Sequence, residues 1–245
     1  MENSNIYTER ISRFYDQIVH SHYYDYIGLA KQLADLFGTK KELLEVGIGT
    51  GLAAEQMLSL GYRITGVDFS QEMLRICDKR LHGKANLCLK NIRDYKSKQK
   101  FDAAYSIGGA WYATANNQGE VQVMSYLHSI RDNILGLRNI ATHLQKDGIL
   151  ALTIQKAHKN LHRLALDKVG YYTHHIKLEG AYLKKSYYVT KNKQVLAKQR
   201  CIFKVFGVGE FNQMLTSVGL SKIHFNDAKS LVYMEKNNSK ARIFY

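Results

Sequence analysis

The strongest constraint on the fold is a glycine-rich turn that lies between two short apolar strands. Residues 43–51 read LLEVGIGTG and residues 64–68 read ITGVD, with a helical stretch between the two runs. The glycines in this turn permit backbone conformations, and a close approach of other groups, that a Cβ atom would prevent. A strand, a glycine-rich turn, a helix and a second strand in this order predict a βαβ unit with parallel strands.

The carboxylate at the end of the second strand indicates what the turn could bind. Asp68 can accept hydrogen bonds from both hydroxyls of a ribose, so the turn and the carboxylate together predict an adenosine-binding site. A dinucleotide site would show similar glycines. Its G-x-G-x-x-G pattern requires a glycine at position 52, where this chain has Leu52. Dinucleotide binding is therefore the less favoured alternative.

Two motifs resemble those of the class I S-adenosylmethionine (SAM) dependent methyltransferases. The first motif of that family reads acidic-x-Gly-x-Gly-x-Gly and corresponds to residues 45–51 here. Its second strand ends in a Val-Asp-x-Ser-x-x-Met run, which corresponds to residues 67–73. The resemblance extends over residues 40–155. Residues 206–220 also resemble the C-terminal part of small-molecule methyltransferases that act on glycine or on amino sugars.

This resemblance implies SAM as the cofactor and S-adenosylhomocysteine as its product. Glu45 would meet the positive end of the cofactor, and Asp68 would bind the ribose. Phe69 and Met73 offer apolar faces to the adenine, although ordinary helix packing would also explain both residues. The expected cofactor-binding residues are Tyr15, Glu45, Gly47, Gly49, Gly51, Asp68, Phe69, Met73, Asn91, Ile92 and Ser106.

The adenine edge is expected to be read at the end of the third strand. The family usually has an aspartate there, but the spacing of this chain places Asn91 in that position, with Asp94 as the alternative. An asparagine carbonyl can still accept a hydrogen bond from the adenine amino group. Asp102 begins the fourth strand, at the end of the sheet away from the ligand, so we expect it to have a structural role.

Apolar runs and helical patterns alternate along the first two thirds of the chain. Residues 18–37 show the apolar spacing of one helix, which ends before Gly38. The alternation predicts an α/β fold with a doubly wound, mainly parallel sheet, and the resemblance implies that this Rossmann-like sheet has seven strands. The strands are expected at residues 42–46, 63–68, 85–90, 101–107 and 148–155.

The pattern changes after residue 155 and predicts an antiparallel insertion between the fifth strand and the last helix, and the resemblance implies that this insertion is a lid over the acceptor. Residues 171–176, 181–189 and 195–206 are rich in β-forming side chains, and Lys191-Asn192-Lys193 is typical of a hairpin turn. A helix over 211–218 and a strand pair at 220–225 and 230–235 follow. We expect one domain, 1–245, made of an N-terminal helical cap (1–40), a SAM-binding core (41–155), a substrate lid (156–206) and a C-terminal helix and strand pair (207–245).

Methyl transfer requires mainly that the acceptor be aligned with the donor in a dry site, and it needs a base only where the acceptor must lose a proton. In the small-molecule methyltransferases that this chain resembles, the N-terminal segment folds over SAM and contributes a tyrosine near its carboxylate or the reacting methyl. Tyr15 is the best candidate for that role here, although packing on an amphipathic helix would also explain it. At most one of the adjacent His174 and His175 can face the acceptor as a base, because neighbouring strand residues point to opposite sides. Both are kept as candidates. The expected substrate-binding residues are Trp111, Tyr112, Tyr182 and Tyr188.

The Asn/Asp-Pro-Pro-Tyr/Phe motif of enzymes that methylate the amines of nucleic-acid bases is missing from this chain. Residues 106–111, SIGGAW, occupy its position, and the chain contains no proline. This excludes that class of methyltransferase. By strand alternation, Tyr182, Lys184, Ser186 and Tyr188 should share one face of the lid.

Charge and cysteine content bear on partners and compartment. The net charge of +14 could attract an acidic partner, but the lysines are spread along the chain, which favours a solvated surface over nucleic-acid binding. Three widely spaced cysteines and the lack of an apolar run of about 18 residues favour reduced thiols, no membrane insertion and a cytoplasmic location. His158 and His162 have the spacing of a helical metal pair, but no further ligand pattern follows, so no metal is expected.

The sequence therefore predicts a SAM-dependent methyltransferase that acts on a nitrogen or oxygen of a small metabolite. Whether the acceptor is anionic, and whether the chain forms a homo-oligomer, stays open. One alternative is methylation of RNA or protein, which the positive charge motivates. Another is a SAM-binding protein that transfers no methyl group. Analysis of the reaction product separates the three.

Overall fold

A parallel sheet lies at the centre of the molecule, in a computed structural model that describes residues 7–22, 24–115, 118, 120–156, 159–226 and 230–237. Its strands follow the order β3-β2-β1-β4-β7, and each neighbouring pair is parallel. All of them fall where the sequence predicts strands. They are β1 (Glu42–Val46), β2 (Arg63–Asp68), β3 (Asn86–Leu89), β4 (Phe101–Ser106) and β7 (Leu144–Lys156).

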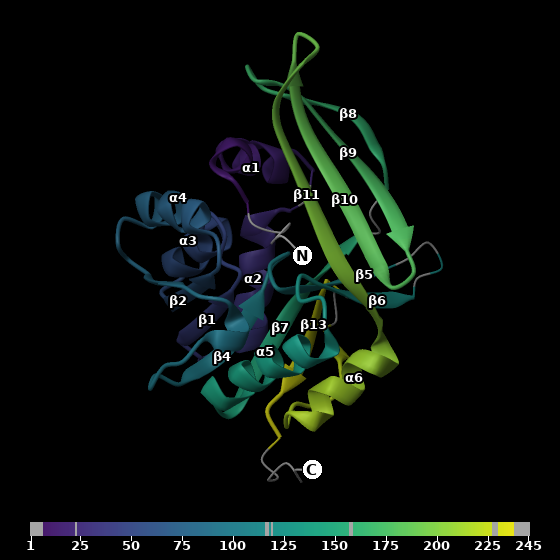
Figure 1. The fold of residues 1–245 in the computed structure, drawn as a ribbon. Helices are drawn as coiled ribbons and strands as arrows, with labels where there is room; N and C mark the ends of the chain where they lie inside the picture. Colours follow the sequence, from purple (N-terminus) through teal and green to yellow (C-terminus); the bar gives the residue numbers. More distant parts are fainter. Residues whose placement is uncertain are drawn as a thin grey trace.

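Helices cover both faces of this parallel sheet (Figure 1). Strand alternation sends neighbouring side chains to opposite faces. Leu43 accordingly packs against helices on one face, which are α2 (Tyr26–Phe37), α3 (Leu52–Ser59) and α4 (Gln71–Leu81). Leu44 packs against helices on the other face, which are α5 (Ile130–His143) and α6 (Val208–Ser217). The α/β class and the mainly parallel core are thus confirmed.

The prediction of one helix over residues 18–37 is wrong. The chain forms α1 (Glu9–His22) and then α2, which begins after Asp25. The Asp25 side chain accepts a hydrogen bond from the Gly28 backbone N–H at 3.0 Å, which caps the new helix and separates the two. Tyr23, which the prediction placed on the helical face, lies outside the described residues.

A second, antiparallel part follows the parallel core. The hairpin between its two longest strands turns at Asn192 and Lys193, which have φ values of 49° and 64°, as a type I′ turn requires. The three predicted strands are confirmed here, whereas β5, β6 and β8 were not predicted. The strands are β5 (Trp111–Ala115), β6 (Val121–Ser125), β8 (Leu161–Leu166), β9 (Gly170–Glu179), β10 (Tyr182–Lys191) and β11 (Gln194–Gly207).

Across the described residues, the two parts join into one sheet of 13 strands. The five parallel strands, together with a C-terminal strand pair beside β7, account for seven of them, and the antiparallel part supplies the rest. The two parts join through the long strand β7. It pairs with β4 through Leu152 and then with β5 from Ile154 onward, and β5 leads through β6 into β11. A short antiparallel pair, β12 (His224–Phe225) and β13 (Leu231–Glu235), lies against β7 as well.

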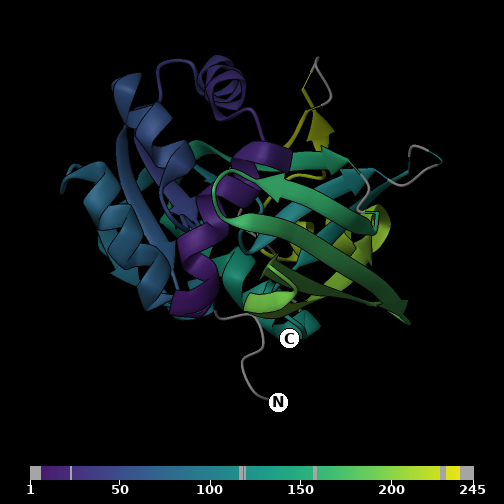
Figure 2. The same cartoon turned by 90° about the horizontal axis from the view of Figure 1, so that it is seen from above.

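Helix α1 lies between the core and the long strands β8–β11 (Figures 1 and 2). Its side chains Ile11 and Ile18 are buried against Leu166, Tyr172 and Val189 of the antiparallel strands. The helix therefore closes the space between the carboxyl ends of the parallel strands and the antiparallel sheet. None of the helices in the described part of the chain has the length and apolar character that a membrane span requires.

Candidate active site

The glycine-rich turn and Asp68 form one hydrogen-bonded unit at the carboxyl ends of β1 and β2. The Gly49 backbone N–H donates to Asp68 Oδ2 at 2.9 Å, and the Ser70 N–H donates to Oδ1 at 2.8 Å. A Cβ atom at Gly47 would lie 2.6 Å from the Cα of Gly109, so only glycine permits this approach. The carboxylate is thereby fixed at the point where both strands end.

A cavity of about 780 Å³ opens beside this unit, and we call it the carboxyl-end cavity. It lies beyond the ends of the parallel strands, where open α/β sheets bind their ligands. Most of the predicted cofactor residues line it. They are Tyr15, Gly47, Gly49, Asp68, Phe69, Met73, Asn91 and Ile92, and they are joined by Tyr7, Val46, Val67, Lys90, Gly108, Gly109, Ala110, Tyr126 and Leu127.

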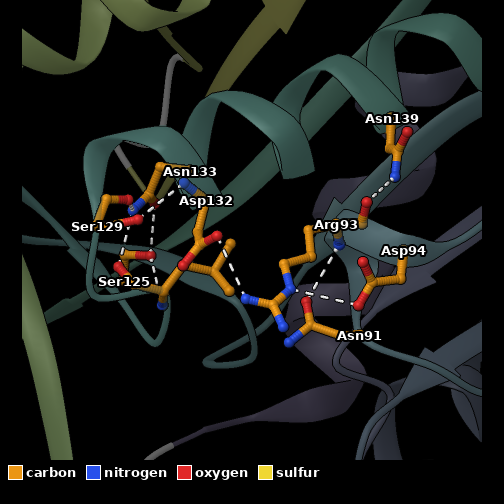
Figure 3. Close-up of polar contacts among 9 residues, drawn as sticks. Asn91, Arg93, Asp94, Ser125, Ser129, Asp132, Asn133 and Asn139 are labelled. Atoms are coloured by element: carbon orange, nitrogen blue, oxygen red, sulfur yellow. Dashed lines mark hydrogen bonds and ion pairs between the residues drawn. The ribbon is translucent and has the colours of Figure 1, made fainter.

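Asn91 rather than Asp94 lines the carboxyl-end cavity, as the spacing predicts. Asn91 Oδ1 accepts from the Arg93 backbone N–H at 3.1 Å and so begins the short helix η1 (Ile92–Asp94; Figure 3). Asn139 of α5 fixes this turn by donating to the carbonyl oxygens of Ile92 and Arg93, at 2.9 and 2.6 Å. Asp94 is instead exposed and forms an ion pair with Arg93.

Glu45 is 2% exposed and lies beside a smaller cavity of about 260 Å³. The Tyr105 hydroxyl donates to its Oε2 at 2.8 Å. Burial raises the pKa of the Glu45 carboxyl to about 8, because an ionised carboxylate loses hydration there. Burial also raises the pKa of Asp68, but backbone N–H donors oppose that shift. A cationic group beside Glu45 would favour its ionised form.

A third cavity, of about 540 Å³, lies between α1 and the antiparallel strands, and we call it the tyrosine cavity. Four residues, Tyr7, Tyr15, Gly108 and Tyr126, line both this cavity and the carboxyl-end cavity, so the two adjoin. Tyr15 also lines the cavity beside Glu45. The other lining residues are Ile11, Ile18, Val19, Tyr24, Tyr112, Gln155, Lys185, Tyr187 and Phe203.

Three predicted site residues have structural positions instead. Trp111 is fully buried, and its Nε1–H donates to Asn133 Oδ1 at 2.7 Å (Asn133 is shown in Figure 3), so it belongs to the core. Ser106 Oγ donates to the carbonyl oxygen of Val46 at 2.9 Å and joins β4 to β1. Gly51 begins α3 at a φ of 82°, where a Cβ would lie 2.7 Å from Cys77 Sγ. None of the three lines a described cavity.

Neither of the two histidines predicted as base candidates lines an inner cavity. His174 is 1% exposed and bonded on both ring nitrogens, to the Tyr172 hydroxyl at 3.2 Å and to the Lys159 carbonyl at 2.7 Å. His175 lies on the exposed face of the antiparallel sheet, beside Tyr188. The structure therefore places neither histidine at an inner cavity, and His175 instead lines an open groove on the outer face of the sheet.

The lid prediction identified the alternation of β10 but chose the wrong face. Lys184, Ser186 and Tyr188 do share a face, but it borders an open outer groove. Tyr182 donates to the His128 carbonyl oxygen at 3.3 Å and lines neither inner cavity. Of the predicted substrate-binding residues, Tyr112 alone lines the tyrosine cavity.

The inward face of β10 carries Lys185, a site residue that the sequence reading missed. The side chain lines the tyrosine cavity, is 1% exposed and lies opposite Cys201 of β11. Burial lowers the pKa of the Lys185 ammonium to about 7, because the charged form loses hydration. The sequence signal was the pair Lys184-Lys185, since alternation must turn one of two neighbouring lysines inward.

The histidine spacing considered for a metal pair does not form a helical pair. His162 lies on strand β8, and His158 lies outside the described residues. Among the residues that the structure does describe, no group of three or more metal-binding side chains comes together.

Comparison with known proteins supports one class of enzyme. Residues 43–148, somewhat less than half of the chain, match the family model of a methyltransferase domain. Together with the fold and the position of the cavities, this match supports a class I SAM-dependent methyltransferase domain in this part of the chain. A search of curated proteins finds no significant match.

Solved methyltransferase structures share the fold over almost the whole chain. DesVI from Streptomyces venezuelae is 20% identical, with a TM-score of 0.72 over 93% of this chain and 98% of that one. CalS10, a SAM-bound amino pentose methyltransferase from Micromonospora echinaspora, is 16% identical, with a TM-score of 0.70 over 95% and 99%. The sugar N-methyltransferase KedS8 from a Streptoalloteichus species is 15% identical, with a TM-score of 0.68 over 91% and 93%.

SAM is the cofactor of this class, and the residues present fit it. Glu45 offers a buried carboxylate to a cationic group, and Asp68 offers a second carboxylate where β2 ends. A Cβ at Gly49 would meet no atom within 4 Å, so the turn leaves open space at the cavity wall. Met73 and Ile92 add apolar surface suited to a purine.

Proposed function

We propose that the protein transfers a methyl group from SAM to an amino nitrogen of a small, sugar-like acceptor. The observation that carries the proposal is the border between the two main cavities. One contains the glycine-rich turn and Asp68, the other is lined by tyrosines, and they share Tyr7, Tyr15 and Tyr126. A donor in the first cavity and an acceptor in the second would meet at these rings.

The cofactor roles follow from the lining residues. Asp68 would bind the ribose hydroxyls through oxygen lone pairs that its two backbone donors leave available. Asn91 and Ile92 would contact the adenine edge, with Phe69 and Met73 against its faces. Glu45 would pair with the α-ammonium of the methionyl part, which would hold the carboxyl ionised at neutral pH.

The tyrosine cavity suits a small polar molecule with an apolar ring skeleton. Tyr112 and Phe203 form one aromatic wall, with their rings edge to face at a centroid distance of 5.7 Å. Helix α1 and the strands β9–β11 cover the cavity, so we assign residues 1–40 as the cap, 156–206 as the lid, 41–155 as the cofactor-binding core and 207–245 as the C-terminal helix and strand pair. The amino pentose methyltransferase CalS10 and the sugar N-methyltransferase KedS8 share this arrangement of elements, which supports an amino-sugar acceptor.

SAM supplies an activated methyl group when it is bound, so the protein must mainly align the acceptor and exclude water. Tyr15 lies on α1, at the border of all three inner cavities, and is held edge to face against Tyr7 at 5.4 Å. Both rings line the border between the donor and acceptor cavities, so they would lie beside the reacting groups and reduce their contact with water. We assign Tyr15 the role of positioning the acceptor nitrogen in line with the methyl group.

Hydroxyl oxygen is the second candidate atom, because tyrosine hydroxyls and the Gln155 amide line the cavity and could form hydrogen bonds with a sugar hydroxyl.

Methylation of RNA is disfavoured by the direction in which the basic side chains point. Lys184, Lys198 and Arg200 border the outer groove, on the opposite side of the sheet from the tyrosine cavity. A basic track beside the methyl site would have required the inward face.

Incubation with methyl-labelled SAM tests the proposal. The acceptors are a panel of amino sugars with primary and secondary amines, the matching sugars with hydroxyls only, and fractionated cell extract of the source. We expect label in a small amine product and equimolar S-adenosylhomocysteine. Label in RNA or protein, or tight SAM binding with no transfer to any fraction, would contradict the proposal and support one of the alternatives.

A further inference from the structure

The short turn η1 forms the part of the carboxyl-end cavity that we assign to adenine. Its own hydrogen bonds are few, because the turn is three residues long. The Asp94 backbone N–H donates to the Asn91 carbonyl oxygen at 2.9 Å, and the next bond, from Tyr95 to Ile92, is long at 3.4 Å. Groups outside the turn must therefore help to fix the direction of its backbone.

The Asn139 amide of α5 supplies two such bonds at once. Its Nδ2 donates to the carbonyl oxygen of Ile92 at 2.9 Å and to that of Arg93 at 2.6 Å. An amide nitrogen carries two hydrogens, and the two carbonyl groups use both. Figure 3 shows the side chain directed from the helix toward the turn. Asn139 thus holds two successive peptide groups of η1 from outside the cavity.

A single peptide group connects Asn139 with Asn91. The Ile92 carbonyl and the Arg93 N–H belong to the same planar unit. The carbonyl accepts from Asn139, and the N–H donates to Asn91 Oδ1 at 3.1 Å. Hydrogen bonds joined in this way strengthen and orient one another. The Asn91 side chain lines the carboxyl-end cavity and is therefore fixed through Asn139, which does not line it.

The other described contacts between α5 and this segment act elsewhere. Arg93 pairs with Asp132 at 3.3 Å, but the two side chains are 40% and 29% exposed, and such a pair contributes little. His143 Nε2 accepts from the Ser97 backbone N–H at 3.0 Å, which lies beyond the turn. Among the described contacts, the Asn139 amide is therefore the one through which α5 holds the backbone of η1.

We propose that Asn139 is a positioning residue for recognition of the cofactor base. By orienting the peptide group between Ile92 and Arg93, it holds Asn91 and Ile92 in the arrangement that meets the adenine edge. This inference rests on the proposed function in one respect, which is the placement of adenine against Asn91 and Ile92. It requires no assumption about the acceptor.

The test compares two ligands that differ in the base alone. S-adenosylhomocysteine carries adenine, whereas S-inosylhomocysteine carries hypoxanthine, in which a carbonyl oxygen replaces the amino group and N1 bears a hydrogen. Donors and acceptors along this edge are thereby exchanged. Contacts to the ribose and to the amino-acid part are the same in both ligands and cancel in the ratio of the two affinities. That ratio, from calorimetric titration, is the preference for adenine.

We expect the wild type to prefer the adenine ligand at least about tenfold, as a site that forms hydrogen bonds with its ligand does. Asn139→Ala should lower the preference about three- to tenfold, the scale of one or two hydrogen bonds. Asn139→Asp keeps the shape of the side chain but turns an acceptor toward two carbonyl oxygens, so the preference should fall at least as far. An unchanged preference in both variants would overturn the proposal.

Two further variants separate the possible causes. Asp102 also fixes two backbone groups, but at the far end of the sheet, so Asp102→Asn should lower stability and keep the preference for adenine. Asn91→Ala tests the placement of the base. A lower preference in Asn91→Ala beside an unchanged one in Asn139→Ala would overturn the role of Asn139 and keep that placement. An unchanged preference in Asn91→Ala would contradict the placement itself, and the inference with it.

A second measurement uses the protein without ligand. Hydrogen exchange of the Asp94 backbone N–H reports on opening of η1. In Asn139→Ala this exchange should become about three- to tenfold faster, for the same loss of hydrogen bonds. The Leu74 N–H, which donates to the Ser70 carbonyl oxygen at 3.1 Å in α4, is the internal control and should not change. Equal rates for Asp94 in the variant and the wild type would show that Asn139 does not hold the turn.

Discussion

Asp16 of α1 and Arg80 of α4 form an ion pair that joins the N-terminal helix to the core. Asp16 Oδ1 also accepts from the Thr50 hydroxyl at 2.6 Å, and Arg80 Nε–H donates to the Thr50 carbonyl oxygen at 2.9 Å. Thr50 belongs to the glycine-rich turn, so helix, turn and α4 are tied at one point. Tyr15 precedes Asp16 in the chain, and its position over the cavities depends on this connection.

Asp16→Asn is expected to weaken SAM binding about three- to tenfold. The variant retains an acceptor for Thr50 but loses the charge that pairs with Arg80, and a partly buried ion pair contributes about 1 kcal/mol. Calorimetric titration with SAM measures the change. Glu9→Gln is the matched control, because it removes an exposed ion pair with Arg13 on the same helix and should leave the affinity unaltered. Equal affinities for Asp16→Asn and wild type would show that α1 is not held by this pair.

Asp68→Asn is expected to lower SAM affinity by about 1.5–3 kcal/mol, since the ribose would lose its charged acceptor. The carboxylate also accepts from the Gly49 and Ser70 N–H groups, so the stability of the free protein should fall as well. Asp102→Asn separates the two effects. Asp102 Oδ2 accepts from the backbone N–H groups of Lys41 and Glu42, both at 3.0 Å, at the far end of the sheet. The Asp102→Asn variant should therefore be less stable than the wild type but should bind SAM with unchanged affinity.

Local sequence determined the parallel core well. The bounds of β1 and β2 match the prediction, because each apolar run ends at a residue with a distinct local role, Gly47 and Asp68. Strand β5 was missed because it follows a glycine pair that indicates a loop. Its strand state depends on pairing with β7 and β6, which a local pattern cannot show.

Local sequence also predicted the cofactor side of the site, because one βαβ unit supplies most of its residues. The acceptor side was not. Alternation along β10 defines two faces, but long-range pairing decides which face is inward, and a shift of one residue exchanges them. Here the register of β10 with β11, and of β11 with β6, turns Lys185 and Tyr187 inward and Tyr188 outward.

SAM binding near pH 7 is expected to release up to about one proton. Glu45 holds a proton in the free protein because burial raises its pKa to about 8, and pairing with the cofactor ammonium requires the ionised form. Calorimetry in two buffers with different ionisation enthalpies counts the protons. Glu45→Gln should abolish the release, whereas Glu42→Gln, at the exposed end of the same strand, should not.

The same shift affects stability in the free protein. Because the folded state binds the Glu45 proton more tightly than the unfolded state, its contribution to stability is present at low pH and is lost as the pH rises from about 4.5 through about 8. Glu45→Gln should flatten that decline in a series of denaturant titrations. An identical decline in wild type and variant would contradict the raised pKa.

Trp111→Phe is expected to lower stability without changing acceptor binding. The indole N–H bond to Asn133 is lost, which costs about 1 kcal/mol, and a gap remains where the larger ring was. Ser125 Oγ still donates to Asn133 Oδ1 at 2.7 Å, so this oxygen keeps a partner and the loss should stay below about 3 kcal/mol. For a chain of this length, that predicts a fall in Tm of about 2–10 °C. An increase in KM for the acceptor with unchanged Tm would instead indicate that Trp111 belongs to the substrate-binding site.

The outer groove distinguishes a small acceptor from a nucleic acid. Lys184, Lys198 and Arg200 border it, on the opposite side of the antiparallel sheet from the tyrosine cavity. Replacing all three with alanine should leave SAM affinity and transfer to a small acceptor unchanged, because none of them lines an inner cavity. If RNA were the substrate, the triple variant would lose its affinity for RNA. In the wild type, the logarithm of the RNA affinity would then fall linearly as the logarithm of the salt concentration rises. Fluorescence anisotropy with a labelled RNA at several salt concentrations, beside the transfer assay, decides between the two: loss of methyl transfer in the triple variant would overturn the assignment of the acceptor to the inner cavity.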